Sequence, residues 1–260
     1  MTRRILEPAP RANLVWFDEV DSTNDLAARL MTAWIESDNA LLKETLVVAG
    51  RQSAGRGRGA NRWESPPGGL YATWLAWLPL EALATLPMAV GVALAEAVEA
   101  MLPRTRVGMK WPNDLQVKGR KLAGVLCQSR GHGDAAWVLA GFGVNVAADP
   151  ALAKGDPVRP TSLRVLGFKG DAGAACWQLA GGFLARIHPL LASPQTAIAA
   201  WVARSVHRRG EAMQLRLGGE VVEGRFAGFA PDGQLELEVG GSVRRFASGE
   251  LIAKGSGPGG

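Results

Sequence analysis

The chain has 260 residues, of which 47% are hydrophobic and 20% are charged, and this ordinary balance excludes wholesale disorder. It is long enough for one sizeable domain with a core of its own and a small second domain. The net charge of +5 favours an acidic partner or a polyanionic ligand, without choosing among nucleic acid, nucleotide and protein.

The first part of the chain predicts two strands separated by a helix. Residues 14–20 alternate enough to form an edge strand, and residues 21–24 (Asp-Ser-Thr-Asn) are four successive helix-capping types. Apolar residues then recur at three- and four-residue steps over residues 26–34, which predicts a helix with one apolar face. Residues 45–50 predict a short buried strand whose end leads to Gln52.

A loop rich in glycine and arginine follows at residues 55–63, with the sequence Gly-Arg-Gly-Arg-Gly-Ala-Asn-Arg-Trp. The glycines let the backbone bend, and the guanidinium groups match phosphate or carboxylate oxygens. Because no helical pattern and no Gly-Lys-Ser/Thr ending follows, the loop is neither a Walker loop nor a dinucleotide fingerprint. We interpret it as a mobile anion clamp anchored by Trp63; the alternative is a solvated surface loop.

The middle of the chain predicts strands around a second helix. Residues 70–78 form an aromatic-rich strand pattern, and Pro87 is placed to open a helix over residues 88–101. Residues 107–115 and 120–127 look like two adjacent strands. Residues 137–146 predict another strand, whose small residues would let a ligand approach the backbone closely.

The last hundred residues change in character. Residues 149–171 are irregular, and amphipathic helices are expected from Ala174 and over residues 195–204. From Ala212 onward, short strand patterns alternate with turns that contain glycine. We expect a domain over residues 1–205, a small β domain over residues 206–254 and a disordered tail at residues 255–260.

Several features bear on compartment and metal content. Cys127 and Cys176 lie far apart in apolar surroundings, which indicates two buried thiols in a reducing compartment. No secretory signal is visible, and no run of about 18 apolar residues suggests a membrane span. We therefore expect a cytoplasmic protein with no membrane partner. The three histidines show no ligand spacing, so no metal site is expected.

Four segments stand out together. They are Ser-Thr-Asn at 22–24, Gln52 with the arginine loop, Lys-Trp-Pro-Asn-Asp at 110–114 and Gly-Arg-Lys-Leu-Ala-Gly at 119–124. In this order and spacing they resemble the biotin protein ligase family, whose members activate biotin with ATP and transfer it to a carboxyl-carrier protein. The resemblance runs from about Asp21 to Val146 and resumes at residues 247–250. Only about twenty residues precede the first segment, so the implied type is monofunctional, without an N-terminal DNA-binding domain.

The resemblance implies an α/β (α+β) fold: a mixed sheet flanked by helices, like that of class II aminoacyl-tRNA synthetases, followed by a small SH3-like β-barrel. It implies ATP and biotin as substrates, and Mg²⁺ is inferred from the reaction rather than from any ligand cluster. The implied partner is the biotin carboxyl carrier protein domain of a biotin-dependent carboxylase. The enzyme is expected to act as a monomer or homodimer, without DNA.

The resemblance also assigns roles to residues. Lys121, Arg56 and Arg58 would offset charge on the carboxylate and phosphoryl oxygens, and Asp114 would hold or deprotonate the acceptor amine. Trp63 would cover the apolar part of the adenylate. The implied substrate-binding set is Ser22, Thr23, Asn24, Gln52, Arg56, Gly57, Arg58, Trp63, Lys121, Gly124 and Asn145.

Alternatives remain for some residues and for the activity. The loop has Ala60 and Asn61 where the family usually has glycine and arginine, which bears on how its distal half holds ligand. Residues 22–24 could only cap a helix, and Asp114 could only form a turn. A lipoate-protein ligase shares the fold and chemistry but lacks Lys-Trp-Pro-Asn-Asp. A regulator that binds biotin without turnover would instead show salt-sensitive DNA affinity.

Overall fold

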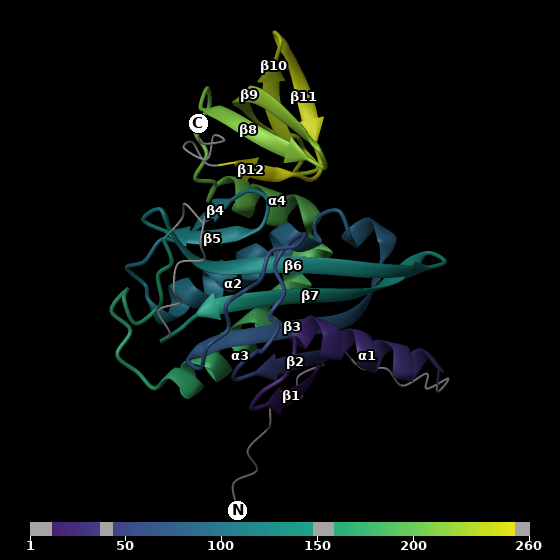
Figure 1. Cartoon of the computed structure of the whole chain (residues 1–260), viewed down its shortest axis with the longest axis vertical. Coiled ribbons are helices and arrows are strands. Elements are labelled where there is room, and N and C mark those ends of the chain that lie inside the picture. The colour runs from purple at the N-terminus through teal and green to yellow at the C-terminus, as the bar shows by residue number, and fades with distance from the viewer. Residues whose placement is uncertain (1–11, 37–43, 148–158, 253–260) are drawn as a thin grey trace, which may run out of the picture.

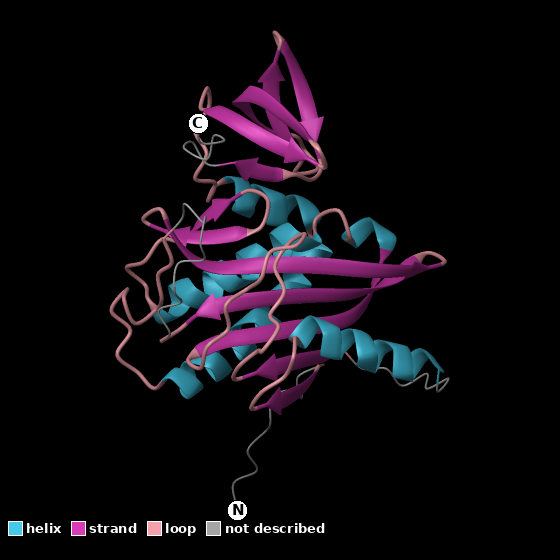
Figure 2. Ribbon diagram, viewed as in Figure 1, coloured by secondary structure: helices cyan, strands magenta, loops and turns pink. Residues whose placement is uncertain are grey.

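The computed structural model describes residues 12–36, 44–147 and 159–252, and its largest element is a seven-stranded sheet (Figures 1 and 2). In order across the sheet, the strands are β1 (Asn13–Phe17), β2 (Thr45–Ala49), β3 (Gly69–Pro79), β7 (Ala135–Asn145), β6 (Arg120–His132), β5 (Asp114–Val117) and β4 (Gly108–Lys110). β1 and β2 are parallel, and every other neighbouring pair is antiparallel. The sheet is therefore mixed, as expected.

Helices cover both faces of this sheet (Figure 1). α1 (Thr23–Glu36) lies on one face over a small apolar cluster that includes Ala27, Val47 and Leu139. On the other face, α2 (Leu86–Met101), α3 (Ala172–Ala192) and α4 (Pro194–Val202) pack into the main core. A short 3₁₀ helix, Leu80–Ala82, leads from β3 toward α2.

The burial of β3 explains why its sequence is almost continuously apolar. Every residue from Gly69 to Ala76 is buried, because helices pack on both faces of the sheet. Trp74 is fully buried and meets Phe183 of α3 edge-to-face, with ring centroids 6.0 Å apart. The aromatic strand pattern therefore reflects a position at the centre of the core.

A second, five-stranded antiparallel sheet follows α4. In order across the sheet, its strands are β11 (Ser242–Phe246), β10 (Leu235–Val239), β9 (Glu220–Phe229), β8 (Ala212–Leu217) and β12 (Glu250–Ile252). The expected glycine turns lie between these strands, and Gly218, Gly233 and Gly240 have positive φ. Phe229 of this sheet meets Trp201 of α4, with ring centroids 5.0 Å apart, so the two sheets share apolar contacts through α4 (Figure 1).

Two strand predictions need correction. The single strand expected over residues 107–115 is two strands, β4 and β5, because the turn through Trp111 and Pro112 reverses the chain. β6 runs on to His132 instead of ending near Cys127, because it forms a long hairpin with β7. The expected disordered tail lies outside the described residues, as does much of the irregular segment at 149–171.

Both cysteines are unpaired, and burial raises the pKa of the Cys127 thiol to about 12 and that of Cys176 to about 11. By surface exposure Cys176 is buried, as predicted, whereas Cys127 is only partly buried. Within the described parts of the chain, no helix is long and apolar enough to cross a membrane.

Candidate active site

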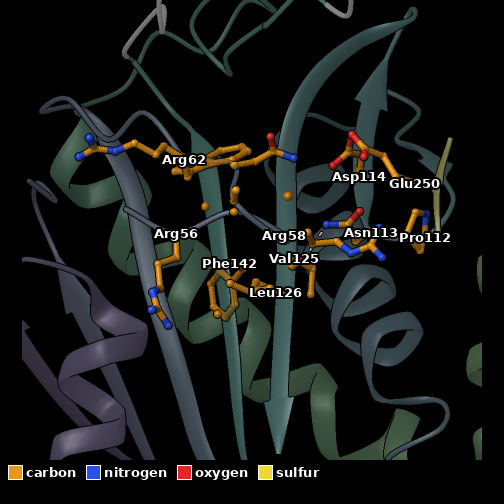
Figure 3. Close-up of a pocket in the computed structure, with 18 of the residues that line it drawn as sticks. Arg56, Arg58, Arg62, Pro112, Asn113, Asp114, Val125, Leu126, Phe142 and Glu250 are labelled. Atoms are coloured by element: carbon orange, nitrogen blue, oxygen red, sulfur yellow. Dashed lines mark hydrogen bonds between the residues drawn. The ribbon is translucent and has the colours of Figure 1, made fainter. Parts of the chain in front are cut away.

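A cleft of about 1050 Å³ lies between the large sheet, the arginine loop and the edge of the second sheet (Figure 3). It brings together nearly all the site residues predicted from the sequence, although they come from five separate segments. Those that line it are Ser22, Thr23, Asn24, Gln52, Arg56, Gly57, Arg58, Trp63, Asp114, Lys121 and Gly124. The second sheet adds side chains that were not predicted, among them Arg216 and Glu250.

The floor of the cleft is set by strand register. Asp114, Gly124 and Gly143 lie opposite one another on β5, β6 and β7 and so share one face of the sheet. Gly141, two positions away on β7, lies opposite Thr73 of β3. A Cβ atom at Gly143 would overlap the Trp63 indole, and one at Gly141 would overlap the Asn24 side chain. Glycine is required here because other side chains lie directly on the backbone.

One end of the cleft is a buried polar network around the start of α1. The Ser22 hydroxyl lies 3.4 Å from the Asp25 amide, in the position of an N-cap, and also lines the cleft. Gln52 Oε1 accepts hydrogen bonds from the Thr23 amide at 2.8 Å and from the Thr23 hydroxyl at 3.1 Å. Gln52 Nε2 donates to Ser65 Oγ at 2.8 Å. Capping and cleft lining are thus combined in the same short segment.

The sequence analysis missed two further members of this network. The Thr73 hydroxyl donates to Asn24 Oδ1 at 2.6 Å, and Asn24 Nδ2 donates to Gln128 Oε1 at 3.3 Å. Thr73 is fully buried. A hydroxyl in the middle of an otherwise apolar, aromatic-rich strand was the available signal, because a buried polar group requires a partner.

The arginine loop folds as a short hairpin over the floor. The Trp63 amide donates to Gly55 O at 3.0 Å, and the Gly57 amide donates to Asn61 O at 2.8 Å. Gly59 turns the chain with φ of 60°, and the Asn61 amide donates to Arg58 O at 3.1 Å. The residues at 60 and 61 that depart from the family pattern therefore form the hairpin turn.

Trp63 lies against the sheet at the end of this hairpin. Its nearest contacts on the floor are the glycines of β6 and β7, and Lys121 Nζ lies 5.2 Å from the ring centroid. The indole Nε1 is buried and has no hydrogen-bond partner among the described residues. The role predicted for this tryptophan, covering the apolar part of the adenylate, stays a prediction.

Most basic side chains of the cleft are already engaged. Lys121 Nζ lies 2.9 Å from Asp114 Oδ1, and both side chains are largely buried, at 22% and 15% exposed. Arg56 pairs with Asp25 of α1 at 3.1 Å, and Arg58 Nη1 donates to Gly249 O of the second sheet at 2.8 Å. Figure 3 shows Arg56 and Arg62 at one end of the pocket and Arg58 near Asn113 at the other.

The segment that carries Asp114 is held from behind by His207. The Trp111 amide donates to His207 Nε2 at 3.0 Å, which requires the imidazole to be neutral on that nitrogen. Burial lowers the pKa of His207 to about 4; Glu211 opposes this shift and the charge of Lys110 adds to it. The ring also packs against Phe226 of the second sheet, with centroids 5.5 Å apart.

Asn145 does not lie where the ligand-binding assignment places it. Its side chain is buried on the same face of the sheet as Gly143, at the end of β7, and Nδ2 donates to Thr161 O at 3.0 Å and more weakly to Lys121 O at 3.5 Å. It is not among the lining residues. The amide fixes the backbone that carries Lys121, because a buried side-chain donor is satisfied by main-chain carbonyls.

No protein metal site is visible in the described segments. Over residues 12–36, 44–147 and 159–252, no group of three or more His, Cys, Asp or Glu side chains is placed to hold a metal ion.

The comparisons with known proteins agree on a family. The family described as "Biotin/lipoate A/B protein ligase family" matches residues 16–145. A biotin–[acetyl-CoA-carboxylase] ligase of Paracoccus denitrificans is 32% identical over 230 residues, which cover 84% of this chain and 90% of that protein. A bifunctional ligase/repressor of Salmonella typhimurium is 34% identical over 149 residues, which cover 55% of this chain but 44% of that protein. A biotin protein ligase from Aquifex aeolicus, solved in complex with biotin and ATP, has a TM-score of 0.70 and 26% identity, over 92% of this chain and 97% of that chain.

Proposed function

The chain belongs to the biotin/lipoate A/B protein ligase family, and on this premise we propose that it is a biotin protein ligase. It activates biotin with ATP to biotinyl-5'-AMP and transfers the biotinyl group to a lysine of a carboxylase's carrier protein. The observation that carries this function is the cleft itself, which joins a buried polar end, a flat glycine floor and a set of basic side chains.

These three parts match the three parts of the ligand. The network of Ser22, Thr23 and Gln52 offers donors and acceptors for the ureido ring of biotin. The Trp63 indole lies on the glycine floor and offers a flat apolar surface to the ligand. Lys121 and Arg58 face the place where the carboxylate must meet the α-phosphate.

In the first step, a carboxylate oxygen of biotin attacks the α-phosphorus of ATP, and pyrophosphate leaves with the bonding electron pair. The biotin carboxylate replaces Asp114 as the partner of Lys121. The Lys121 ammonium group then binds the negative charge at the reacting centre. Arg56 and Arg58 offset the negative charge that develops on the phosphoryl oxygens. The Trp63 hairpin covers the mixed anhydride and keeps water away from it.

In the second step, the neutral amine of the acceptor lysine attacks the acyl carbon, and AMP leaves. The Asp114 carboxylate, freed from Lys121, is the group that holds this amine and accepts its proton. In this proposal Lys121 acts in the first half-reaction and Asp114 in the second, so the ion pair between them separates during the reaction.

Further features belong to the same proposal. We assign residues 1–205 to a catalytic domain of the class II synthetase-like type and residues 206–254 to an SH3-like barrel. Mg²⁺ would enter with ATP, because this ion keeps several waters and binds through substrate phosphates. The acceptor is a carrier domain of a biotin-dependent carboxylase. A cytoplasmic location, a monomeric or homodimeric state and the lack of a DNA partner stay predictions.

Biotin-dependent exchange of labelled pyrophosphate into ATP tests the activation step without the acceptor. We expect exchange with biotin and little with lipoate. When the acceptor is added, the biotinylated carrier domain should appear. Exchange with lipoate alone would make the chain a lipoate ligase. Biotin binding without any exchange would favour a regulator, which should also bind DNA with affinity that falls as salt rises.

A further inference from the structure

Side chains of alternating charge connect the floor of the cleft to the second sheet. Lys121 pairs with Asp114 on the floor, and Glu250 Oε2 pairs with Arg216 Nη1 at 3.1 Å on β12 and β8. Arg58 belongs to neither pair. Figure 3 shows Arg58, Asp114 and Glu250 at the same end of the pocket.

Arg58 keeps most of its hydrogen-bonding capacity for a ligand. A guanidinium group carries five N–H donors, and among the described residues that of Arg58 makes one hydrogen bond, to Gly249 O at 2.8 Å. Burial lowers the pKa of Arg58, whereas the charges of Asp114 and Glu250 oppose that shift. Both carboxylates therefore act on Arg58, although each is paired with another cation.

The number of Arg58 N–H groups that stay available to a ligand depends on which cation the Glu250 carboxylate binds. Glu250 follows Gly249 directly, so its carboxylate is carried by the same short segment that already binds Arg58. Gly249 has φ of 146°, and a Cβ atom there would overlap the Leu215 side chain, so only glycine fits in this segment. Arg216 lies directly opposite Glu250 in the strand register. Without Arg216, the carboxylate would turn to Arg58, because guanidinium and carboxylate groups favour bidentate pairs.

We propose that Arg216 is a positioning residue for the ligase reaction: by holding the Glu250 carboxylate, it leaves Arg58 available to the phosphate groups of ATP. This inference rests on the proposed function. Arg216 and Glu250 are about half exposed, at 49% and 54%, so their pair contributes little to the stability of the fold. Its contribution is to keep the neighbouring Arg58 guanidinium free of a carboxylate partner.

The test uses Arg216→Ala, Glu250→Gln and the double variant. Arg216→Ala should raise the KM for ATP about 10-fold in pyrophosphate exchange, as expected for the loss of one charge-assisted hydrogen bond. Glu250→Gln should raise the KM for ATP much less than Arg216→Ala does, because no carboxylate remains to pair with Arg58. In the double variant, KM should return to near the wild-type value, because the neutral side chain no longer captures Arg58. Arg216→Lys should have a KM for ATP close to that of the wild type, because lysine also pairs with the Glu250 carboxylate.

Arg245→Ala is the matched control. Arg245 forms a pair of the same kind with Glu236, at 3.0 Å on the same sheet, and neither residue lines the cleft. The inference is overturned if Arg216→Ala and Arg245→Ala have the same KM, or if the double variant stays as weak as Arg216→Ala. ATP binding by calorimetry gives the same comparison without turnover. If the wild type shows no biotin-dependent exchange, the proposed function fails, and calorimetry still decides the role of Arg216.

Discussion

Lys121 and Asp114 form the charged centre of the cleft, 2.9 Å apart, with other cations around them. We predict that Lys121→Ala lowers biotin-dependent pyrophosphate exchange by about 10²- to 10³-fold, the usual loss when one group that stabilises transition-state charge is removed. The fold should persist, because Lys121 lies at the start of β6 and is not part of the core. Near-wild-type exchange by a folded variant would remove Lys121 from the mechanism.

Asp114 should act in the other half-reaction. Asp114→Asn keeps the shape of the side chain but cannot accept the proton of the amine, so transfer of isolated biotinyl-5'-AMP to the carrier domain should fall about 10²-fold. Pyrophosphate exchange should fall much less. Single-turnover transfer measures this directly, and transfer at the wild-type rate would leave Asp114 with a turn-forming role only.

His207 makes stability depend on pH. Its folded-state pKa of about 4 lies below the unfolded value near 6.5, so the unfolded chain binds a proton first as the pH falls. This residue therefore costs stability from about pH 6.5 downward, reaching up to about 3 kcal/mol near pH 4.

We predict that His207→Gln, which keeps an acceptor for the Trp111 amide but does not titrate, loses less stability than the wild type over this pH window. Urea unfolding at several pH values between 7 and 4 provides the measurement. Parallel curves for the two proteins would show that His207 is not the titrating group.

At the scale of elements, the cleft depends on how closely other segments approach β6 and β7. A Cβ atom at Gly143 would overlap the Trp63 indole and lift the hairpin from the floor. We predict that Gly143→Ala raises the KM for biotin in pyrophosphate exchange by about 10-fold or more, because the ring no longer covers the ligand.

Gly131→Ala is the control for this prediction. Gly131 lies on the neighbouring strand β6, and the nearest atom to its added Cβ would be Leu80 Cδ2 at 4.0 Å, which is an ordinary contact. The control should match the wild type. Equal effects of the two substitutions would indicate a general loss of strand stability and not a displaced Trp63.

At the scale of the whole molecule, α4 joins the two sheets. Trp201 is 2% exposed, belongs to the main core and contacts Phe229 of the second sheet. We predict that Trp201→Ala lowers the free energy of unfolding by about 3–5 kcal/mol, the usual cost of removing a large core aromatic side chain.

The neighbouring residue provides the comparison for Trp201. Val202 is 39% exposed, so Val202→Ala should change the free energy of unfolding by less than about 0.5 kcal/mol. Urea unfolding measures both variants. A small effect at Trp201 would mean that the second sheet is held mainly by its polar contacts, such as the one between Arg58 and Gly249.

The amino-acid sequence was sufficient for the order of the elements and for most of the site. Periodicity predicted the helices and most strands, because each buries one face, and the glycine turns of the second sheet were visible as local signals. The segments at 22–24, 55–63, 110–114 and 119–124 carried the resemblance because each keeps its residues close together along the chain.

Only the tertiary structure decided which residues meet across the sheet. Thr73, Gln128 and Arg216 reach the site through strand register and the packing of the second sheet, and no local pattern marks such contacts. Asn145 shares the cleft face of β7 with Gly141 and Gly143, but it lies at the end of the strand, where the main-chain carbonyls of Thr161 and Lys121 take up its amide. Short-range patterns can be read directly from the sequence, whereas contacts between side chains far apart in sequence depend on how the layers pack.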